Sequence, residues 1–298
     1  MSTFLQALFV GLRLGSIYAL VALGYTMVYG IIRLINFAHG DFIMVGGYTM
    51  IFTIPLMIAL GLPLWVSVLA AILVCAAVGI STELVAYRPV RKKGTAMSAL
   101  ITAIAVSLIL ENIAQAIPVI GPNPKVANQI FNAGGIRISE VTLDWTTMLT
   151  IGISIVVMVV LYEFTQKTRI GRAMRCVSED KPASILMGIN VNRTIVFTFA
   201  IGSSLSAIAA LMYIAQYPKV YTTMGAMLGL KAFVAAVLGG IGIIPGAMLG
   251  GFVIGLVESF TTGYISSSLA DAFVFLILIV VLIIKPAGIL GKNMGEKV

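Results

Sequence analysis

The residues of this chain best suited to handle a polar solute lie together beside a long apolar stretch. The run N-F-A-H-G-D occupies positions 36–41, and no charged residue follows it from Phe42 to Thr82. Ionisable side chains at a membrane border are costly, and they usually face a partner or a water-filled path. The run therefore predicts an interrupted helix that lines a solute path. Its candidate path residues are Asn36, Phe37, His39, Gly40 and Asp41.

A second candidate segment reads G-G-I-G-I-I-P-G from position 239 to 246. Proline and four glycines in eight residues do not form a regular helix facing lipid, because the freed backbone groups need protein or water partners. A discontinuous helix of this kind often lines a solute path. The alternative is close helix packing through the small-residue spacings 246–250 and 251–255, and the pattern leaves both open. The candidate path residues here are Gly239, Gly240, Gly242, Pro245 and Gly246.

Catalytic chemistry is not indicated by the remaining residues. One His and two Cys cannot supply a Cys/His metal site or a disulfide framework. The sequence contains no G-x-x-x-x-G-K-[ST] phosphate loop and no G-x-S-x-G elbow. We therefore expect no catalytic residue, no metal and no cofactor, and we expect that the chain is not an enzyme.

The composition indicates that these segments lie in a lipid bilayer. Apolar residues make up 60% of the 298 residues and charged residues 10%, with a mean hydropathy of +1.08, whereas soluble domains have about 25% charged residues. We predict an all-α polytopic membrane protein with about eight crossings, plus one element that is broken or re-entrant. The predicted spans are 5–31, 37–60, 63–87, 95–120, 145–165, 194–216, 228–242, 246–264 and 268–285, of which 228–242 and 246–264 are the two short ones.

The distribution of basic residues predicts which ends face the cytoplasm. Most of the 19 Lys and Arg residues gather at 88–93, at 167–193 and at the C-terminus, so these regions should be cytoplasmic. The loop at about 121–144 balances its charges and should be extracytoplasmic. The net charge of +8 then reflects topology and lipid contact rather than nucleic-acid binding. We expect one transmembrane domain over residues 1–298, multi-pass in a bacterial inner membrane.

Three ionisable residues lie close to predicted span ends: Glu83, Glu163 and Lys231. Long charged side chains near a span end can reach the membrane surface while their carbon stems stay in lipid. We therefore expect these three side chains to extend to the surface.

The cytoplasmic loop at about 166–193 predicts a short exposed helix. Ser178 or Asp180 can cap it, Glu179 and Asp180 fall in its first turn, and Gly188 can end it. The expected helix has roughly ten residues. Its apolar residues are Ala183, Leu186, Met187 and Ile189. The basic residues before this helix favour contact with the membrane, whereas its own acidic residues favour a groove on a partner protein.

Three motifs together resemble one family over essentially the whole length. They are N-F-A-H-G-D at 36–41, the loop from Gly171 through Asp180 to Asn190, and G-G-I-G…P-G at 239–246. In this order they closely resemble the permeases of branched-chain amino acid ABC importers, LivH type. The resemblance implies a second related permease, two cytoplasmic ATPases and an extracytoplasmic solute-binding protein as partners. It also implies that residues 178–190 are a coupling helix seated in an ATPase, with Glu179, Asp180, Ala183, Leu186 and Gly188 as its contact residues.

The implied activity is the inward passage of leucine, isoleucine or valine, driven by ATP hydrolysis in the partner chains. Permeases for urea and short amides share the N-F-A-H-G run, so an importer of those solutes is an alternative. An ion-coupled secondary amino-acid carrier is an alternative of a different class. Such a carrier has no need of the loop at 167–193, and it requires a deep carboxylate for its coupling ion.

Overall fold

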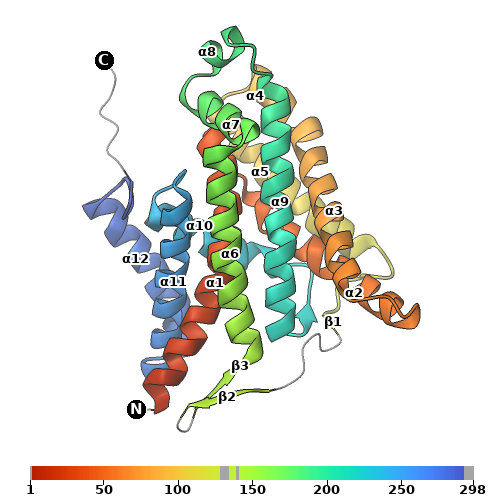
Figure 1. The fold of residues 1–298 in the computed structure, drawn as a ribbon, viewed down its shortest axis with the longest axis vertical. Coiled ribbons are helices and arrows are strands. Elements are labelled where there is room, and N and C mark those ends of the chain that lie inside the picture. The colour runs from red at the N-terminus through yellow and green to blue at the C-terminus, as the bar shows by residue number, and fades with distance from the viewer. Residues whose placement is uncertain (1, 128–133, 139–140, 292–298) are drawn as a thin grey trace. The chain divides into compact units, whose positions relative to one another are not determined.

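The chain folds into helices joined by short connections, with two small β-pairs (Figure 1). The computed structural model describes residues 2–127, 134–138 and 141–291. Within these residues, eight helices are long and apolar enough to cross a membrane. These spans contain α1 (Ser2–Ile32), α2 (Asp41–Ala59), α3 (Trp65–Ser81), α5 (Ala96–Ala116), α6 (Trp145–Lys167), α9 (Val191–Gln216), α11 (Ile244–Tyr264) and α12 (Ala270–Ile284). The predicted all-α polytopic class is confirmed.

The remaining helical elements are shorter and stand beside or between the spans. They are the 3-10 turns η1 (Phe37–His39) and η3 (Ser267–Leu269), the π-helical segment η2 (Thr82–Tyr87), and the helices α4 (Arg88–Lys93), α7 (Arg169–Glu179), α8 (Lys181–Leu186) and α10 (Met224–Gly239). Of the two spans predicted to be short, α10 is short, but α11 has 21 residues and full spanning length. The glycines of α11 do not interrupt it, because they meet neighbouring helix backbones at Ala235, Ala19 and Gly15.

Helix ends follow from local hydrogen bonding. The first amide groups of a helix have no partner within the helix, so a side-chain oxygen just before it stabilises its start. Thr95 Oγ1 accepts from the Ser98 amide at 3.3 Å at the start of α5. Asn190 Oδ1 accepts from the Arg193 amide at 3.0 Å at the start of α9.

The described chain divides into two compact units. Unit 1 contains residues 1–26, 133–162 and 231–298, and unit 2 contains residues 27–132 and 163–230. In unit 2, helices α2, α3 and α9 pack against one another, with Gly46 of α2 lying between Ala207 and Cys75. In unit 1, α11 packs against α12, and Ser259 Oγ donates to the Ala7 carbonyl at 2.6 Å.

Within the described residues, the strands form two antiparallel pairs. In unit 2, β1 (Lys125–Val126) pairs with β4 (Lys219–Val220), where α9 ends. In unit 1, β2 (Gly135–Ile138) pairs with β3 (Val141–Asp144). Both β1 and the β2–β3 pair lie in the predicted extracytoplasmic loop at 121–144. At the other end of α9, α7 and α8 lie near α4 (Figure 1).

Candidate functional site

The segment at 36–41 is an interrupted helix entry within unit 2. Helix α1 ends at Ile32, and Arg33 takes the left-handed backbone conformation with φ of 58°. The turn η1 then begins at Phe37, and α2 begins at Asp41. The interruption predicted from the polar run is therefore present. Asn36, His39 and Asp41 are almost fully buried, whereas Phe37 is half-buried.

The buried polar groups of this segment contact side chains from other helices of unit 2. The Tyr87 hydroxyl donates to Asn36 Oδ1 at 2.9 Å. His39 Nε2 lies 3.2 Å from the hydroxyl of Ser206 in α9, and which atom donates depends on the imidazole tautomer. Because buried polar atoms are costly unless they are hydrogen-bonded, these contacts let an amide and an imidazole lie inside the helix packing.

The start of α2 also lies close to residues 225–229. A side-chain carbon built on Gly40 would overlap the Gly225 carbonyl, and one built on Gly225 would lie 2.7 Å from Asp41 Oδ1. Glycine is therefore required at positions 40 and 225 for this close backbone approach, and Asp41 lies at the contact.

The second candidate segment is the turn between α10 and α11 in unit 1. Gly239 ends α10, Gly240 and Gly242 have φ of 106° and 92°, and Pro245 and Gly246 lie in the first turn of α11. A side-chain carbon on Gly239 would overlap the Gly246 carbonyl, so the two helices meet backbone to backbone.

The carbonyls freed at the end of α10 are bonded by the C-terminal segment. The Ile289 amide donates to the Leu238 carbonyl at 2.8 Å, and the Leu290 amide donates to the Gly239 carbonyl at 3.1 Å. Such contacts are expected from the packing alternative, and the role of this turn in a solute path remains a prediction. The segments at 36–41 and 239–246 lie in different units, and each is held by contacts within its own unit.

The loop at about 166–193 contains two helices where the sequence predicted one. Thr168 Oγ1 accepts from the Gly171 amide at 3.0 Å and begins α7, which was not expected. Asp180 has an extended backbone that ends α7, and its Oδ1 accepts from the Ala183 amide at 3.0 Å to cap α8. The predicted Asp180 cap is confirmed. Two expectations were wrong, because α8 has six residues rather than about ten, and Glu179 ends α7 instead of starting α8.

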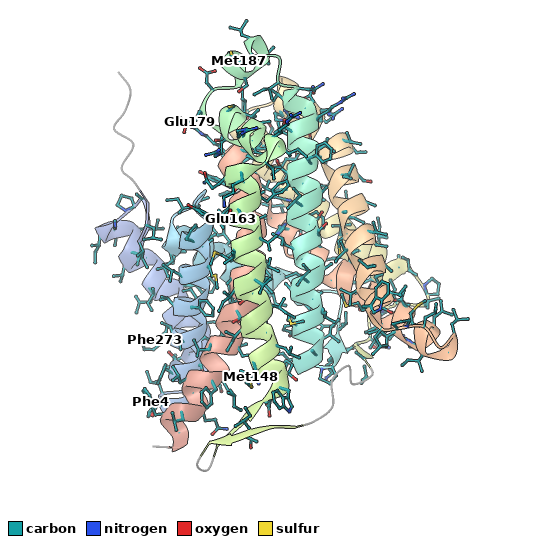
Figure 2. The ribbon with its side chains drawn as sticks, viewed as in Figure 1. Phe4, Met148, Glu163, Glu179, Met187 and Phe273 are labelled. Carbon is teal, nitrogen blue, oxygen red and sulfur yellow. The ribbon has the colours of Figure 1, made fainter. Side chains whose placement is uncertain are left out.

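The end of α8 exposes three large apolar side chains. Ile185 is 62% exposed, Leu186 88% and Met187 81%, and Ala183 is exposed as well. Gly188, with φ of 79°, turns the chain after them, as predicted, and nothing lies within 4 Å of the position of its missing side chain. Figure 2 shows Met187 at the tip of this loop and Glu179 on α7 below it.

Basic side chains surround the base of this loop. Arg33 Nη2 donates to the Ser178 carbonyl at 3.2 Å. Burial, together with the positive charges of Arg91 and Arg33, lowers the pKa of Lys181 below its ordinary value. The electrostatic environment at the start of α8 is therefore positive and disfavours further cations there.

Two of the three side chains expected at the membrane surface are buried instead. The Glu83 side chain is fully buried and forms ion pairs with Arg91 and Arg88. Lys231 is buried between Glu258 and Asp271, at 2.8 and 2.6 Å. Partners of opposite charge on neighbouring turns and helices explain both corrections, since burial of an ion is tolerated when it is paired. Glu163 is partly exposed and pairs with Lys167, as a residue near a span end is expected to be.

Comparisons with known proteins agree over nearly the whole chain. Residues 7–282 match the family model described as branched-chain amino acid transport system / permease component. The chain is 42% identical to the high-affinity branched-chain amino acid transport system permease protein BraD of Pseudomonas aeruginosa, across 99% of this chain and 98% of that protein. It is 41% identical to the permease protein LivH of Escherichia coli K12, with the same coverage. A probable branched-chain amino acid transport permease protein LivH of Methanocaldococcus jannaschii is 29% identical over 93% of this chain and 90% of that protein.

Proposed function

Because the chain belongs to the family of permease components of branched-chain amino acid transport systems, we propose that it passes leucine, isoleucine or valine into the cytoplasm. ATP hydrolysis in partner subunits drives this step, and the chain itself catalyses no reaction and takes no cofactor. The observation that supports ATPase coupling best is the exposed apolar end of α8.

Two large apolar side chains at the end of a six-residue helix, with a third directly after it, are unusual for a surface in water. Removal of apolar area from water is favourable by about 25 cal/mol per Å², so Ile185, Leu186 and Met187 form a small anchor for a complementary groove. Short amphipathic helices recognise grooves on partner proteins in this way. The Asp180 cap fixes the start of α8, and the turn at Gly188 follows its exposed end. The proposed groove belongs to a cytoplasmic ATPase subunit.

The proposed assembly contains a second related permease, which forms a heterodimer with this chain, two cytoplasmic ATPase subunits and an extracytoplasmic solute-binding protein. The chain is multi-pass in a bacterial inner membrane with its C-terminus in the cytoplasm, and residues 1–298 act as one permease domain. Residues 36–41 and 239–246 contribute to the solute path. Interrupted helices supply the fixed dipoles that a zwitterionic solute needs in a bilayer.

Leu186→Glu tests the docking of α8. Leu186 is exposed in the isolated chain, so folding should be little affected, whereas a groove should reject an unpaired charge. We expect the variant to accumulate normally and to lose both co-purification of the ATPase subunits and leucine uptake. Leu186→Met is the matched control and should keep both. Normal uptake by Leu186→Glu would refute the docking.

The energy source distinguishes the importer from an ion-coupled carrier. Uptake in proteoliposomes should require ATP on the cytoplasmic side and persist after collapse of the proton gradient at constant ATP. A carrier predicts the opposite result. Competition among leucine, urea and a short amide then decides the solute class, since only an amide importer would be inhibited by the latter two.

A further inference from the structure

A π-helical segment connects α3 to α4 in unit 2. Segment η2 continues α3 without a break, and α4 follows it directly. Segments of this kind are rare and are frequently found at functional sites. Hydrogen bonds between residues five apart bring Glu83 and Arg88 towards the same face, and Arg88 Nε lies 3.7 Å from Glu83 Oε1. The π-turn thus explains how Glu83 meets a cation on its own helix.

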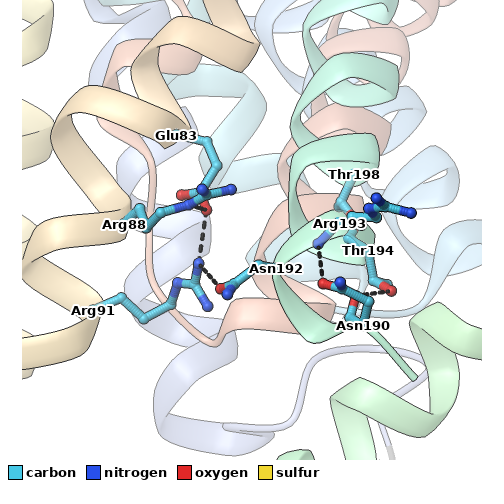
Figure 3. A network of polar contacts seen from close by, with 8 residues as sticks. All are labelled: Glu83, Arg88, Arg91, Asn190, Asn192, Arg193, Thr194 and Thr198. Carbon is cyan, nitrogen blue, oxygen red and sulfur yellow. Dashed lines mark hydrogen bonds and ion pairs between the residues drawn. The ribbon is translucent and has the colours of Figure 1, made fainter. Parts of the chain in front are cut away.

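Arg91 joins the same carboxylate to the start of α9. Its Nη2 donates to Glu83 Oε1 at 2.7 Å and to Asn192 Oδ1 at 3.3 Å (Figure 3). Asn192 is the second residue of α9, and Asn190, which caps that helix, is the last residue before it. The α9 end of the cytoplasmic loop is therefore linked to η2 by the guanidinium of Arg91.

The other end of η2 is fastened to the interrupted entry of α2. Tyr87 is the last residue of η2, and its hydroxyl donates to Asn36 Oδ1 at 2.9 Å. Its buried ring also packs on Phe199 of α9, with ring centroids 5.3 Å apart. Side-chain contacts thus join Asn192 to Arg91 and Arg91 to Glu83, the backbone of η2 connects Glu83 to Tyr87, and Tyr87 contacts Asn36.

A second contact joins the loop to the same entry. Arg33 donates to the Ser178 carbonyl near the end of α7, and Arg33 lies three residues before Asn36. The cytoplasmic loop therefore reaches residues 33–36 directly at its α7 end and through η2 at its α9 end.

A buried ion pair is weak evidence for a role in stability. Well-packed apolar residues of similar volume often stabilise a fold as much as a buried ion pair or more. A buried pair can therefore be retained for another reason, namely that it fixes one arrangement of the helices that carry it. A π-helical turn also has a second, distinct conformation available. If its hydrogen bonds shift from residues five apart to residues four apart, the segment becomes a regular α-helix. Two discrete arrangements of packed elements are what is needed to couple distant sites.

We propose that Glu83 and Arg91 are positioning residues for transport, which pass a displacement of the cytoplasmic loop to the Asn36–Asp41 segment through η2. This inference rests on the proposed function, in which an ATPase subunit moves the loop. Tyr87 connects η2 to the Asn36–Asp41 segment through its hydrogen bond to Asn36. Arg91 connects the two elements, because its Nη2 contacts both Glu83 and Asn192 at the start of α9.

The test measures leucine uptake per ATP hydrolysed by the complete transporter in proteoliposomes. The double variant Glu83→Leu with Arg91→Met removes both charges of the buried pair. Arg88 loses its contact with Glu83, but its side chain is 31% exposed and remains accessible to water. We expect its complex to assemble with ATPase subunits and to hydrolyse ATP, while uptake per ATP falls about tenfold. Wild-type uptake per ATP in the double variant would show that the pair serves only the fold and would overturn the proposal.

Tyr87→Phe keeps the test valid if the double variant fails to fold. It removes one hydroxyl and keeps the ring on Phe199, and it should also lower uptake per ATP, while unchanged coupling in Tyr87→Phe would overturn the proposal. Arg91→Lys should keep part of the wild-type uptake per ATP. Lysine keeps a cation near Glu83, but it lacks the planar guanidinium that contacts Glu83 and Asn192 together. The exposed Tyr264→Phe and Glu163→Gln are controls and should match wild type. Uptake by wild type without ATP would instead refute the proposed function, which separates the two failures.

Discussion

Lys231→Met should destabilise the protein strongly, because Lys231 is the cation of a buried group in unit 1. Its Nζ contacts Glu258 at 2.8 Å and Asp271 at 2.6 Å, and the Tyr18 hydroxyl donates to Glu258 at 2.7 Å. These contacts join α10, α11, α12 and α1. Removal of one partner from a buried ion pair costs about 3–5 kcal/mol, because the other charge remains buried.

The contacts place the expected loss at the lower end of that range. The Asp271 side chain is 48% exposed and stays solvated, whereas that of Glu258 is 15% exposed and keeps only the Tyr18 hydrogen bond. We therefore expect a loss of about 3 kcal/mol. At 2–4 °C per kcal/mol for larger chains, Tm should fall by roughly 6–12 °C.

The assay is thermal unfolding of the purified chain in detergent. Addition of Glu258→Gln to Lys231→Met removes the buried charge and should restore most of the loss. The control Lys167→Met breaks an exposed pair with Glu163, which is worth only about 0.3–0.5 kcal/mol. The exposed pair should change Tm by only about 1 °C. A Tm for Lys231→Met within about 1 °C of the Lys167→Met value would therefore refute the reasoning.

Asp180→Ala removes the cap of α8 at a cost of about 1 kcal/mol, so hydrogen exchange over residues 181–186 should accelerate, whereas Asp180→Asn should keep wild-type protection. Gly246→Leu should prevent accumulation of folded protein, because its side chain would overlap the Gly239 carbonyl, while Gly152→Leu meets open space and should accumulate normally on an immunoblot. Lys181→Gln should be at least as thermostable as wild type at neutral pH, because burial, Arg91 and Arg33 lower the pKa of Lys181 and so disfavour its charged form in the folded state. Since the unfolded chain binds that proton more tightly, wild-type stability should rise as pH increases from the lowered pKa towards 10.5, and the advantage of Lys181→Gln should shrink in Tm measurements there.

The spans and the loop cap were predictable because both depend on local sequence. A charge-free stretch such as 42–82 has few alternatives to membrane helices. Asp180 followed by Lys181 and Pro182 is a local signal for a helix start, and the structure confirms it. The existence of an interruption near Asn36 was likewise visible in the residues themselves.

The buried charges were not predictable, because their partners are set by tertiary structure. Glu83 reaches Arg91 through a π-turn that no propensity indicates, and Lys231 meets Asp271 only after α10, α11 and α12 are packed. Helix α7 was missed for another reason. Its many basic residues indicate sidedness rather than helix, whereas the signal for the helix is Thr168, which caps it through the Gly171 amide.

The two interrupted segments differ in what holds them, and this difference predicts which one moves. Besides the close approach of Gly40 to Gly225, side-chain hydrogen bonds hold residues 36–41, and side-chain partners can be exchanged. Backbone hydrogen bonds and a glycine contact hold residues 239–246, which could move only if the hairpin opened. In a chain with exposed Cys176 replaced by serine, thiol labelling of Phe37→Cys should therefore differ between the nucleotide-free and ATP-bound transporter, and labelling of Ile243→Cys should not. Both native side chains are half-buried, so the two positions are matched in initial access. Constant labelling at 37, or equal changes at both positions, would show that the kind of hydrogen-bond partner does not decide which segment moves.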